Sequence, residues 1–362
     1  MRMLAGWRRA QGALLLCLSA LGVAHAEPFS FVALGDTAYN GEADYPVYSA
    51  LINRINQERP AFSIHIGDVW GATSCLDEDH RQILGWFARY EHPLIYTPGD
   101  NEWTDCIDPE VIAADERIDE GKARPGDEQL LADFKQLSSR ATRPGKWALD
   151  SLARIRRTYF STPRSLGQTT IPLVRQAATS RRHPQMVENA RWAKDSVVFA
   201  TVHVVGSMNS LSVASPEAAA EAVARNQANV EWIQQTFAEA AKTDAKAIVL
   251  AMHASFFDKM PAPGQGTGHA VRGGRSGPYG LIALAIQELS AQFGKPVLLI
   301  HGDDHEFTID RPFLTPDEAK QQFKGGNVMR LQVYGAPEIR AVRIGVDTAT
   351  PWVFSFSPLF MQ

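Results

Sequence analysis

Short apolar runs alternate with helical patterns near the start of the chain. Runs that begin at Phe29, Ser63 and Leu94 contain the β-branched and aromatic residues typical of buried strands. Between them, residues 44–59 and 80–90 repeat apolar positions every three or four residues, which predicts helices. This strand–helix–strand–helix–strand order predicts parallel strands joined by right-handed crossover connections.

The alternation resumes near residue 196. We expect strands at 196–205, 247–252 and 297–301, separated by helices at 216–242 and 280–293. The C-terminal tail alternates further apolar runs with turns, at 328–334, 339–346 and 352–356. Short turns between neighbouring runs predict an antiparallel meander. The whole pattern therefore predicts an α/β fold built on two mixed sheets.

Residues from 105 to about 195 interrupt this pattern. Long apolar runs are missing there, and prolines recur at positions 109, 125, 144, 163, 172 and 184. We interpret the stretch as a loop-and-helix insertion, such as a cap over the active edge, within a single domain of residues 27–362. A flexible surface excursion is the alternative interpretation.

The first 26 residues have the organisation of a secretory signal peptide. Arginines precede an apolar run at 13–23, and Ala-His-Ala at 24–26 fits a small-x-small cleavage site. The run is shorter than the roughly 20 residues of a membrane-spanning helix, and an anchor that stays uncleaved is the alternative. The pattern therefore predicts an exported protein, periplasmic or secreted, with no membrane attachment after cleavage.

Composition and charge narrow the possible function classes. The chain has 45% apolar and 21% charged residues, as expected for a globular protein with a substantial core. Without the predicted signal peptide it carries 33 basic and 40 acidic side chains, a net charge of −7. This acidic balance argues against a broad nucleic-acid-binding surface.

Cysteine usage points to one disulfide. Cys17 lies within the predicted signal peptide, which leaves Cys75 and Cys106 in the exported chain. Two cysteines in an exported protein indicate a bridge, and each of these follows a Gly-Asp turn by six or seven residues. If those turns share one rim, a Cys75–Cys106 bridge is feasible; two buried free thiols are the alternative.

Four of the expected strands end in the dipeptide Gly-Asp. The carboxylates are those of Asp36, Asp68, Asp100 and Asp303. Because ligands bind at the carboxyl ends of parallel strands, we expect these side chains at one rim of the molecule. A fifth strand ends at His253, and carboxylates with imidazoles suit Mg²⁺, Mn²⁺, Fe or Zn²⁺. A carboxylate can bridge two ions about 4 Å apart, a pair that orients a phosphate and activates a water.

The order of these residues resembles that of the calcineurin-like metallophosphoesterases, a superfamily that includes the purple acid phosphatases. The family pattern is D-x-H, GD, GNH[DE], a lone His and GHxH, each after a strand. The corresponding residues lie between positions 29 and 310 and are Asp36, Gly67-Asp68, Gly99-Asp100-Asn101-Glu102, His253 and Gly302-Asp303-Asp304-His305. The resemblance implies a four-layer α/β/β/α sandwich of two mixed sheets. It also implies hydrolysis of a phosphate ester by a metal-activated water at a dinuclear site.

Carried over position by position, the resemblance also implies a ligand set. Asp36 and His305 would bind the first metal ion, and Asp68 would bridge the two ions. His253 would bind the second ion. The implied cofactors are therefore two divalent metal ions.

Several positions depart from the family pattern. Ala38 stands where D-x-H has its histidine, and Tyr39 is the neighbour that could reach a metal instead. Asp100 replaces the metal-binding Asn, and Asp303 replaces the first His of GHxH. These carboxylates make the site harder and more negative, which favours Mg²⁺, Mn²⁺ or Ca²⁺ over softer ions. A more negative site holds a dianionic monoester less well, so a phosphodiester or small organic phosphate is the expected substrate.

The proton donor to the leaving group must also be reassigned. Asn101 takes the place of the histidine that contacts the phosphate, and it remains a candidate catalytic residue. His203 and His301, both near strand ends, are candidate replacements for the missing acid. Both could equally be hydrogen-bonded core histidines.

Two further assignments follow from position. The Gly-rich loop at 264–277 contains Arg272 and Arg275, which could hold a phosphate by paired hydrogen bonds. A mobile, solvated loop is the alternative interpretation. Glu102 is expected to orient a metal ligand rather than to bind the ion itself.

The leading hypothesis is an exported, metal-dependent phosphoesterase that acts on a small phosphorylated molecule. A relative that keeps the fold and binds a metal or a partner without catalysis is the alternative, because two family histidines are missing. A serine hydrolase is disfavoured since the sequence has no G-x-S-x-G elbow. Clustered carboxylates repel one another unless cations neutralise them, which favours metal binding under either hypothesis.

Overall fold

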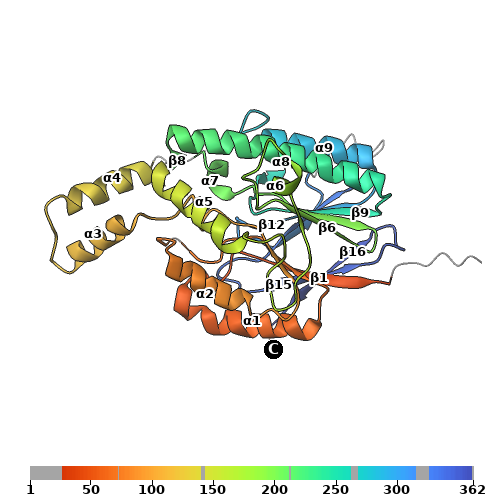
Figure 1. Ribbon diagram of the computed structural model, residues 1–362, viewed down its shortest axis with the longest axis horizontal. Helices are drawn as coiled ribbons and strands as arrows, with labels where there is room; N and C mark the ends of the chain where they lie inside the picture. Colours follow the sequence, from red (N-terminus) through yellow and green to blue (C-terminus); the bar gives the residue numbers. More distant parts are fainter. Residues whose placement is uncertain are drawn as a thin grey trace, which may run out of the picture.

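Figure 1 shows two β-sheets packed face to face between two pairs of helices. The computed structural model describes residues 27–71, 73–139, 143–211, 213–261, 268–314 and 326–360. The predicted signal peptide, residues 1–26, lies outside the described residues, as do positions 264–267 of the Gly-rich loop.

In the described part of the chain, the first sheet has five strands in the order β16 (Phe354–Leu359), β15 (Ala341–Val346), β1 (Phe29–Leu34), β2 (Ser63–His65) and β3 (Leu94–Tyr96). The last three strands run parallel, as the alternating pattern predicts, and β15 pairs antiparallel with both β1 and β16.

The second sheet is larger and also mixed. Its described strands are, in order, β13 (Thr308–Asp310), β14 (Val328–Gln332), β12 (Val297–His301), β9 (Ala247–Ala251), β7 (Val197–Thr201), β6 (Ala190–Lys194) and β5 (Val174–Arg175). The four central strands β14, β12, β9 and β7 are parallel, and the strands at both edges are antiparallel to their neighbours.

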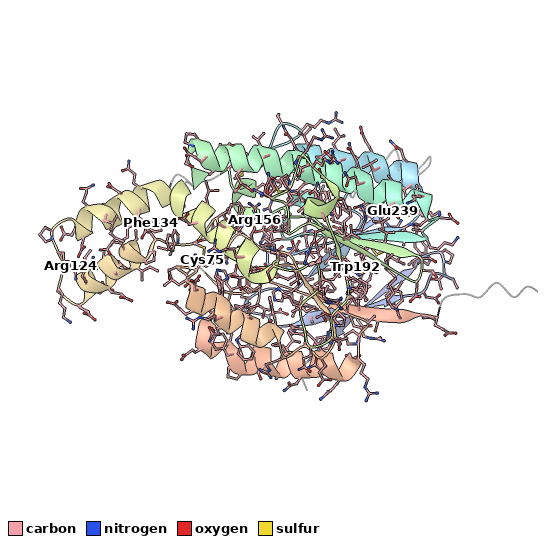
Figure 2. All side chains as sticks on the ribbon, in the orientation of Figure 1. Cys75, Arg124, Phe134, Arg156, Trp192 and Glu239 are labelled. Atoms are coloured by element: carbon pink, nitrogen blue, oxygen red, sulfur yellow. A yellow bond between two sulfur atoms is a disulfide. The ribbon has the colours of Figure 1, made fainter. Side chains whose placement is uncertain are left out.

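Helices cover the outer face of each sheet. The first sheet packs against α1 (Tyr45–Glu58) and α2 (Asp77–Phe87), and the second against α8 (Pro216–Lys242) and α9 (Gly280–Phe293) (Figure 1). Between the sheets lies a buried apolar layer, in which Trp192 stacks on Phe199 (Figure 2). The predicted α/β/β/α sandwich of two mixed sheets is therefore confirmed.

The range predicted as an insertion, 105 to about 195, contains helices joined by connecting segments. α3 (Pro109–Asp119) and α4 (Asp127–Ser139) form a hairpin that extends away from the sheets, with Arg124 at its tip (Figures 1 and 2). α5 (Gly145–Tyr159) returns to the body and packs against α2 and α8. The range then passes through α6 (Gln176–Thr179), between the sheet strands β5 and β6.

The remaining elements are short. They are η1 (Gly41–Ala43), α7 (Gly206–Asn209), the paired strands β10 (Phe257–Pro261) and β11 (His269–Val271), and the paired strands β4 (Arg143–Pro144) and β8 (Val213–Ala214). None of the helices in the described ranges combines the length and the apolar character that a membrane span needs.

The predicted antiparallel meander of the tail is wrong for its first strand. β14 lies in the second sheet and runs parallel to β12, whereas β15 and β16 pair antiparallel in the first sheet. Val328 packs toward the helices and Leu331 toward the other sheet, so β14 is buried on both faces. A strand buried on both faces fits the interior of a sheet, and the short connection after it crosses from one sheet to the other.

Candidate metal centre

Both sheets deliver ligands to the same rim. Asp36, Asp68 and Asp100 follow β1, β2 and β3 of the first sheet. His253 follows β9, and Asp303 follows β12, in the second sheet. Carboxylate oxygens of four residues lie within 4 Å of a ring nitrogen of His253: Asp36, Asp68, Asp100 and Asp303. The rim expected from the Gly-Asp turns is therefore present, and it lies where the two sheets meet.

Glycine precedes each carboxylate because the neighbouring turn leaves no room for a side chain. A Cβ atom on Gly99 would lie 2.0 Å from Asp68 Oδ1, and one on Gly302 would lie 2.0 Å from Asp36 Oδ2. Gly67 has φ +97°, and a Cβ there would overlap the backbone of Gly99. Gly99 and Gly302 thus make space for carboxylates delivered by other strands, and Gly67 makes space for the Gly99 backbone.

Several ligand-bearing residues also have left-handed backbone angles. The φ values are +48° for Asp36, +51° for Asp68, +77° for Asp303 and +60° for His305. Such angles cost of order 1 kcal/mol or more for a residue with a side chain, and they cluster at functional sites. The surrounding fold therefore holds these side chains in positions that an unconstrained turn would avoid.

Asp36, Asp68 and His305 form the first candidate metal group. The Nδ1 atom of His305 donates to the Ala336 carbonyl oxygen at 2.9 Å. Because a carbonyl can only accept, the lone pair of the neutral ring is on Nε2, which lies 3.9 Å from Asp36 Oδ1. The ring is thereby fixed in the tautomer and orientation that metal ligation requires.

The second candidate group is Asp68, Asp100 and His253, so Asp68 belongs to both. His253 Nδ1 donates to the Ile66 carbonyl oxygen at 3.1 Å, which turns its Nε2 atom toward the carboxylates. That nitrogen lies 2.8 Å from Asp100 Oδ1 and 3.4 Å from Asp68 Oδ1. Asp303 Oδ1 lies 3.7 Å from the same nitrogen.

The unpaired atoms at this rim fit divalent cations. Asp36 Oδ2, Asp100 Oδ1 and His253 Nε2 are buried, and within the described ranges no aligned hydrogen bond reaches them, although the last two atoms lie 2.8 Å apart. Buried polar groups are normally paired, and no donor reaches Asp36 Oδ2 within the described residues. The carboxylates of Asp68 and Asp100 outweigh burial and raise the pKa of His253 well above its usual range, so a proton lies beside Asp100 until a cation replaces it. Cations at the two groups would satisfy all three atoms and relieve the repulsion among the carboxylates.

Tyr39 and Asn101 support the shared carboxylate. The Tyr39 hydroxyl donates to Asp68 Oδ2 at 2.6 Å, and the Asn101 backbone NH donates to Asp68 Oδ1 at 3.2 Å. The Asn101 amide donates to the Tyr39 hydroxyl at 2.6 Å and to the Trp70 carbonyl oxygen at 3.0 Å. Tyr39 thus reaches the rim, while both amide hydrogens of Asn101 are used within the protein. Their predicted ligand and catalytic roles remain predictions.

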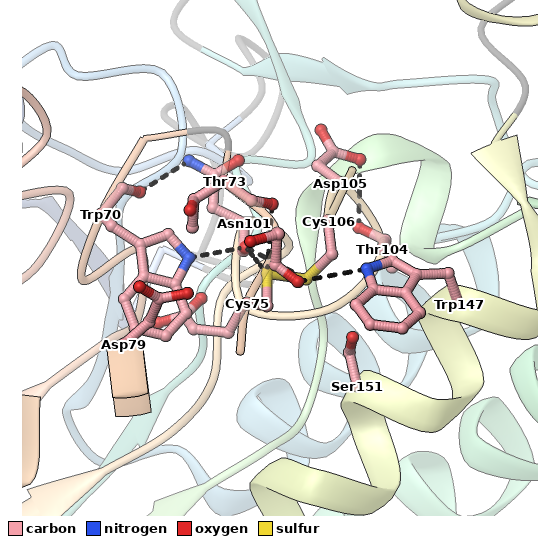
Figure 3. Close-up of a disulfide and its surroundings, with 12 residues drawn as sticks. Trp70, Thr73, Cys75, Asp79, Asn101, Thr104, Asp105, Cys106, Trp147 and Ser151 are labelled. Carbon is pink, nitrogen blue, oxygen red and sulfur yellow. Dashed lines mark hydrogen bonds between the residues drawn. A yellow bond between two sulfur atoms is a disulfide. The ribbon is translucent and has the colours of Figure 1, made fainter. Parts of the chain in front are cut away.

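Glu102 and the disulfide hold the turns after β2 and β3. The buried Glu102 carboxylate accepts from the backbone NH groups of Val69 and Gly99, at 3.1 and 2.9 Å. Cys75 and Cys106 form the predicted disulfide, with Cα atoms 5.7 Å apart (Figure 3). It joins the loops that carry Asp68 and Asp100, so the bridge constrains two ligand-bearing segments relative to each other.

Arg272 and Arg275 have different surroundings. Arg272 forms an ion pair with Asp304, the residue between Asp303 and His305, and it donates to the Phe257 carbonyl oxygen at 3.1 Å. Arg275 is exposed and lines a separate cavity of about 300 Å³ beside the start of α9. Arg272 therefore lies close to the candidate metal groups, and the proposed phosphate clamp stays a prediction for both.

The two candidate acid histidines are both buried. His203 Nδ1 lies 3.3 Å from Glu188 Oε1, and its ring packs against Trp103. His301 lies against Phe256 and Phe257 on the helix-facing side of the second sheet. Burial lowers the pKa of His301 to about 3. Neither histidine belongs to the metal groups found among the described residues.

Two charged and two small residues of the site were not expected from sequence. Arg225 and Glu221 lie on the regular helix α8, and Gly206 and Ser207 lie in a short turn after β7. Ser255 also escaped prediction, although its NH and hydroxyl donate to Asp303 and Asp304. No local motif surrounds these residues, because their contacts come from distant parts of the chain.

Metal binding should strengthen as pH rises from 6 to 8. Burial raises the pKa of Asp36 to about 8 and that of Asp303 to about 7, so cations must displace protons from the metal-free site. Calorimetric titration with Mn²⁺ should show an affinity about tenfold or more higher at pH 8 than at pH 6. Titrations in two buffers of different ionisation enthalpy would count the released protons.

The stability of the metal-free protein should show the opposite trend. The raised pKa of Asp36 means that the folded chain keeps a proton that the unfolded chain has already lost above about pH 4. This contribution to the free energy of unfolding is therefore lost as pH rises toward 8. For the metal-binding prediction of the previous paragraph, an equal Mn²⁺ affinity at pH 6 and pH 8 would contradict the assigned ligands.

Comparison with known proteins gives only distant likenesses. No protein-family model matches the chain, and no curated protein matches it in sequence. A solved dimetal phosphatase from Danio rerio is similar at 8% identity with a TM-score of 0.46, over 93% of this chain and 100% of that one. GAP50, the anchor in the inner membrane complex of Plasmodium, is similar at 10% identity with a TM-score of 0.42, over 92% of this chain and 89% of that one. The roles assigned to individual residues therefore rest on the geometry of the rim.

Proposed function

We propose that the protein hydrolyses a phosphate ester with two divalent metal ions held at the rim between its sheets. The observation that carries the proposal is the pair of ligand groups that share Asp68 and leave buried acceptor atoms unpaired. Asp36 and His305 would hold one ion, and Asp100 and His253 the other. When bound, such a pair orients a phosphate, activates a water and stabilises the leaving oxygen.

The residues of the chain fix this arrangement before any ion binds. Backbone carbonyl groups hold both imidazoles with their Nε2 atoms toward the carboxylates. Tyr39 and Asn101 orient the Asp68 carboxylate. Glu102 joins the turns after β2 and β3 by accepting a backbone NH from each. Preorganisation of this kind lowers the cost of ordering ligands when the ions bind.

The donor set favours hard ions. Asp36, Asp68, Asp100 and Asp303 supply four carboxylates, against the imidazoles of His253 and His305. Oxygen-rich sites suit Mn²⁺, Mg²⁺ and Ca²⁺, while Fe and Zn²⁺ remain compatible with the two imidazoles. The negative charge of the site supports a phosphodiester or a small organic phosphate as substrate in preference to a dianionic monoester.

Export is part of the proposal. The sequence of residues 1–26 predicts a signal peptide, and the Cys75–Cys106 disulfide is typical of proteins that fold in an oxidising compartment. We therefore place the protein in the periplasm or outside the cell, where a small phosphorylated molecule would be its substrate.

A catalytically silent metal-binding protein is the second candidate. The specific observation in its favour is that both amide hydrogens of Asn101 are engaged by Tyr39 and Trp70. Asn101 is thereby less available to contact a phosphate, and the family histidine at this position is missing. In this case the protein would keep its ions but turn nothing over.

An assay with controlled metal content tests the proposal. The purified protein is stripped with EDTA and then supplied with Mn²⁺, Mg²⁺ or Ca²⁺ in the presence of an aryl phosphodiester or an aryl phosphomonoester. We expect no turnover without metal, turnover restored by Mn²⁺, and a higher kcat/KM for the diester. Stoichiometric metal binding without turnover of either ester would favour the silent candidate.

A further inference from the structure

A left-handed turn faces the second metal group. The turn comprises α7 and the next residue, and φ is +48° at Ser207, +58° at Met208, +53° at Asn209 and +69° at Ser210. Four consecutive residues with side chains rarely adopt these angles, because Cβ crowds the following carbonyl oxygen. Such a conformation persists only where the surroundings hold it in place.

The turn lies directly against two carboxylates of the rim. A Cβ atom on Gly206 would lie 2.5 Å from Asp303 Oδ1 and 2.6 Å from Asp100 Oδ2. The next residue, Ser207, donates its hydroxyl to Asp105 Oδ1 at 2.7 Å. The backbone of the turn therefore blocks movement of the Asp100 and Asp303 carboxylates toward it.

Arg225 makes three hydrogen bonds to this turn, which Tyr279 and Asn226 also contact through Asn209. It is fully buried on α8, and its guanidinium donates to Asn209 Oδ1 at 2.6 Å, to the Asn209 carbonyl oxygen at 3.0 Å and to Ser210 Oγ at 2.6 Å. Its Nε atom pairs with Glu221 at 3.1 Å. The planar fork of arginine fits these several acceptors at once, which a lysine ammonium cannot reproduce.

The same guanidinium also contacts the turn after β3. It lies over the ring of Trp103, 5.1 Å from the ring centroid. Trp103 is fully buried, and its backbone NH donates to the Asp100 carbonyl oxygen at 3.0 Å. Arg225 thus contacts both the turn 206–210 and the turn that carries Asp100.

We propose that Arg225 is a positioning residue for the second metal ion. By holding the turn 206–210 against Asp100 and Asp303, it keeps two repelling carboxylates within reach of His253. Without the guanidinium the left-handed residues would relax, and the second ion would lose its preformed site while the first would keep Asp36 and His305. The inference rests on the dinuclear site of the proposed function.

Metal stoichiometry tests this directly. Mn²⁺ titration of wild type should give two sites, and in Arg225→Met the second site should weaken at least tenfold while the first changes by less than about threefold. Electron paramagnetic resonance should show the coupled two-ion signal in wild type and an isolated Mn²⁺ signal in the variant. Arg225→Lys should resemble Arg225→Met, because the fork and not the charge is needed.

Two further variants complete the test. Arg191→Met removes an arginine that lies over Trp232 away from the rim, and it should leave both sites unchanged. Should Arg225→Met fail to fold, Asn209→Ala removes one acceptor of the fork and should weaken the second site in the same direction. Equal second-site affinity in wild type and a folded Arg225 or Asn209 variant would overturn the inference, as would a single site in wild type.

The outcomes separate the two proposals. Turnover by wild type together with unchanged metal binding in the Arg225 variants would reject the positioning role and leave the phosphoesterase intact. The positioning role would be supported, and the phosphoesterase rejected, if wild type binds two ions, the variants bind one, and neither wild type nor the variants turn over an ester. Excess Mn²⁺ should restore part of the activity of Arg225→Met if both proposals hold.

Discussion

Replacement of Asp68 by alanine should abolish hydrolysis. We expect kcat/KM to fall about 10³-fold or more, which corresponds to at least about 4 kcal/mol of lost transition-state stabilisation. Asp68 belongs to both metal groups, so its loss affects both ions at once. The variant should also bind fewer than two Mn²⁺ ions, which calorimetry or elemental analysis would measure beside the rate.

A matched control distinguishes this effect from loss of an acidic charge. Asp115 is exposed on the helical hairpin, and Asp115→Ala removes the same group far from the ligand-bearing turns. It should leave both the rate and the metal content unchanged. Turnover of Asp68→Ala within about tenfold of wild type would exclude the shared-carboxylate arrangement.

Loss of the disulfide should have the largest effect on stability. The bridge closes a loop of 31 residues, and the chain-entropy model gives about 3–4 kcal/mol for a loop of that length. We expect the Cys75→Ser, Cys106→Ser double variant to lose about that much free energy of unfolding, measured by urea denaturation of metal-free protein.

The same variant should also bind metal less tightly. Cys75 and Cys106 join the loops that follow Asp68 and Asp100, and Trp70 donates to the Asn101 carbonyl oxygen beside the bridge at 2.9 Å (Figure 3). Wild type treated with reductant should match the double variant, which serves as the control for side effects of the serines. Unchanged stability in both would show that packing of the two loops, and not the bridge, sets their positions.

The parts of the site that sequence predicted are those whose signal is local. Each Gly-Asp turn joins a strand end, a glycine and a carboxylate within a few residues, and parallel topology brings these ends to one rim. Asp36, Asp68 and Asp100 were predicted in this way, His253 from the end of its own strand, and His305 from the family resemblance. The fold brings these side chains together. The disulfide was predictable for the same reason, because both cysteines follow such turns closely.

Contacts between distant segments were not predictable. Arg225 sits in an ordinary amphipathic helix, and its partners in the turn 206–210 are known only once the fold is formed. The left-handed angles of that turn occur at residues that are not glycine, so composition gives no sign of them. The prediction for the C-terminal tail was wrong for a related reason, because the spacing of apolar runs does not tell which sheet contains β14.

The division of the ligands between the two sheets has a wider consequence. Asp36, Asp68 and Asp100 follow strands of the first sheet, while His253 and His305 follow strands of the second. A small slip of one layer over the other would therefore change many ligand-to-ligand distances at once. The affinity for the ions should therefore depend on how firmly the two sheets are held together. Backbone amides in both sheets should exchange their hydrogens with solvent faster when the ions are removed.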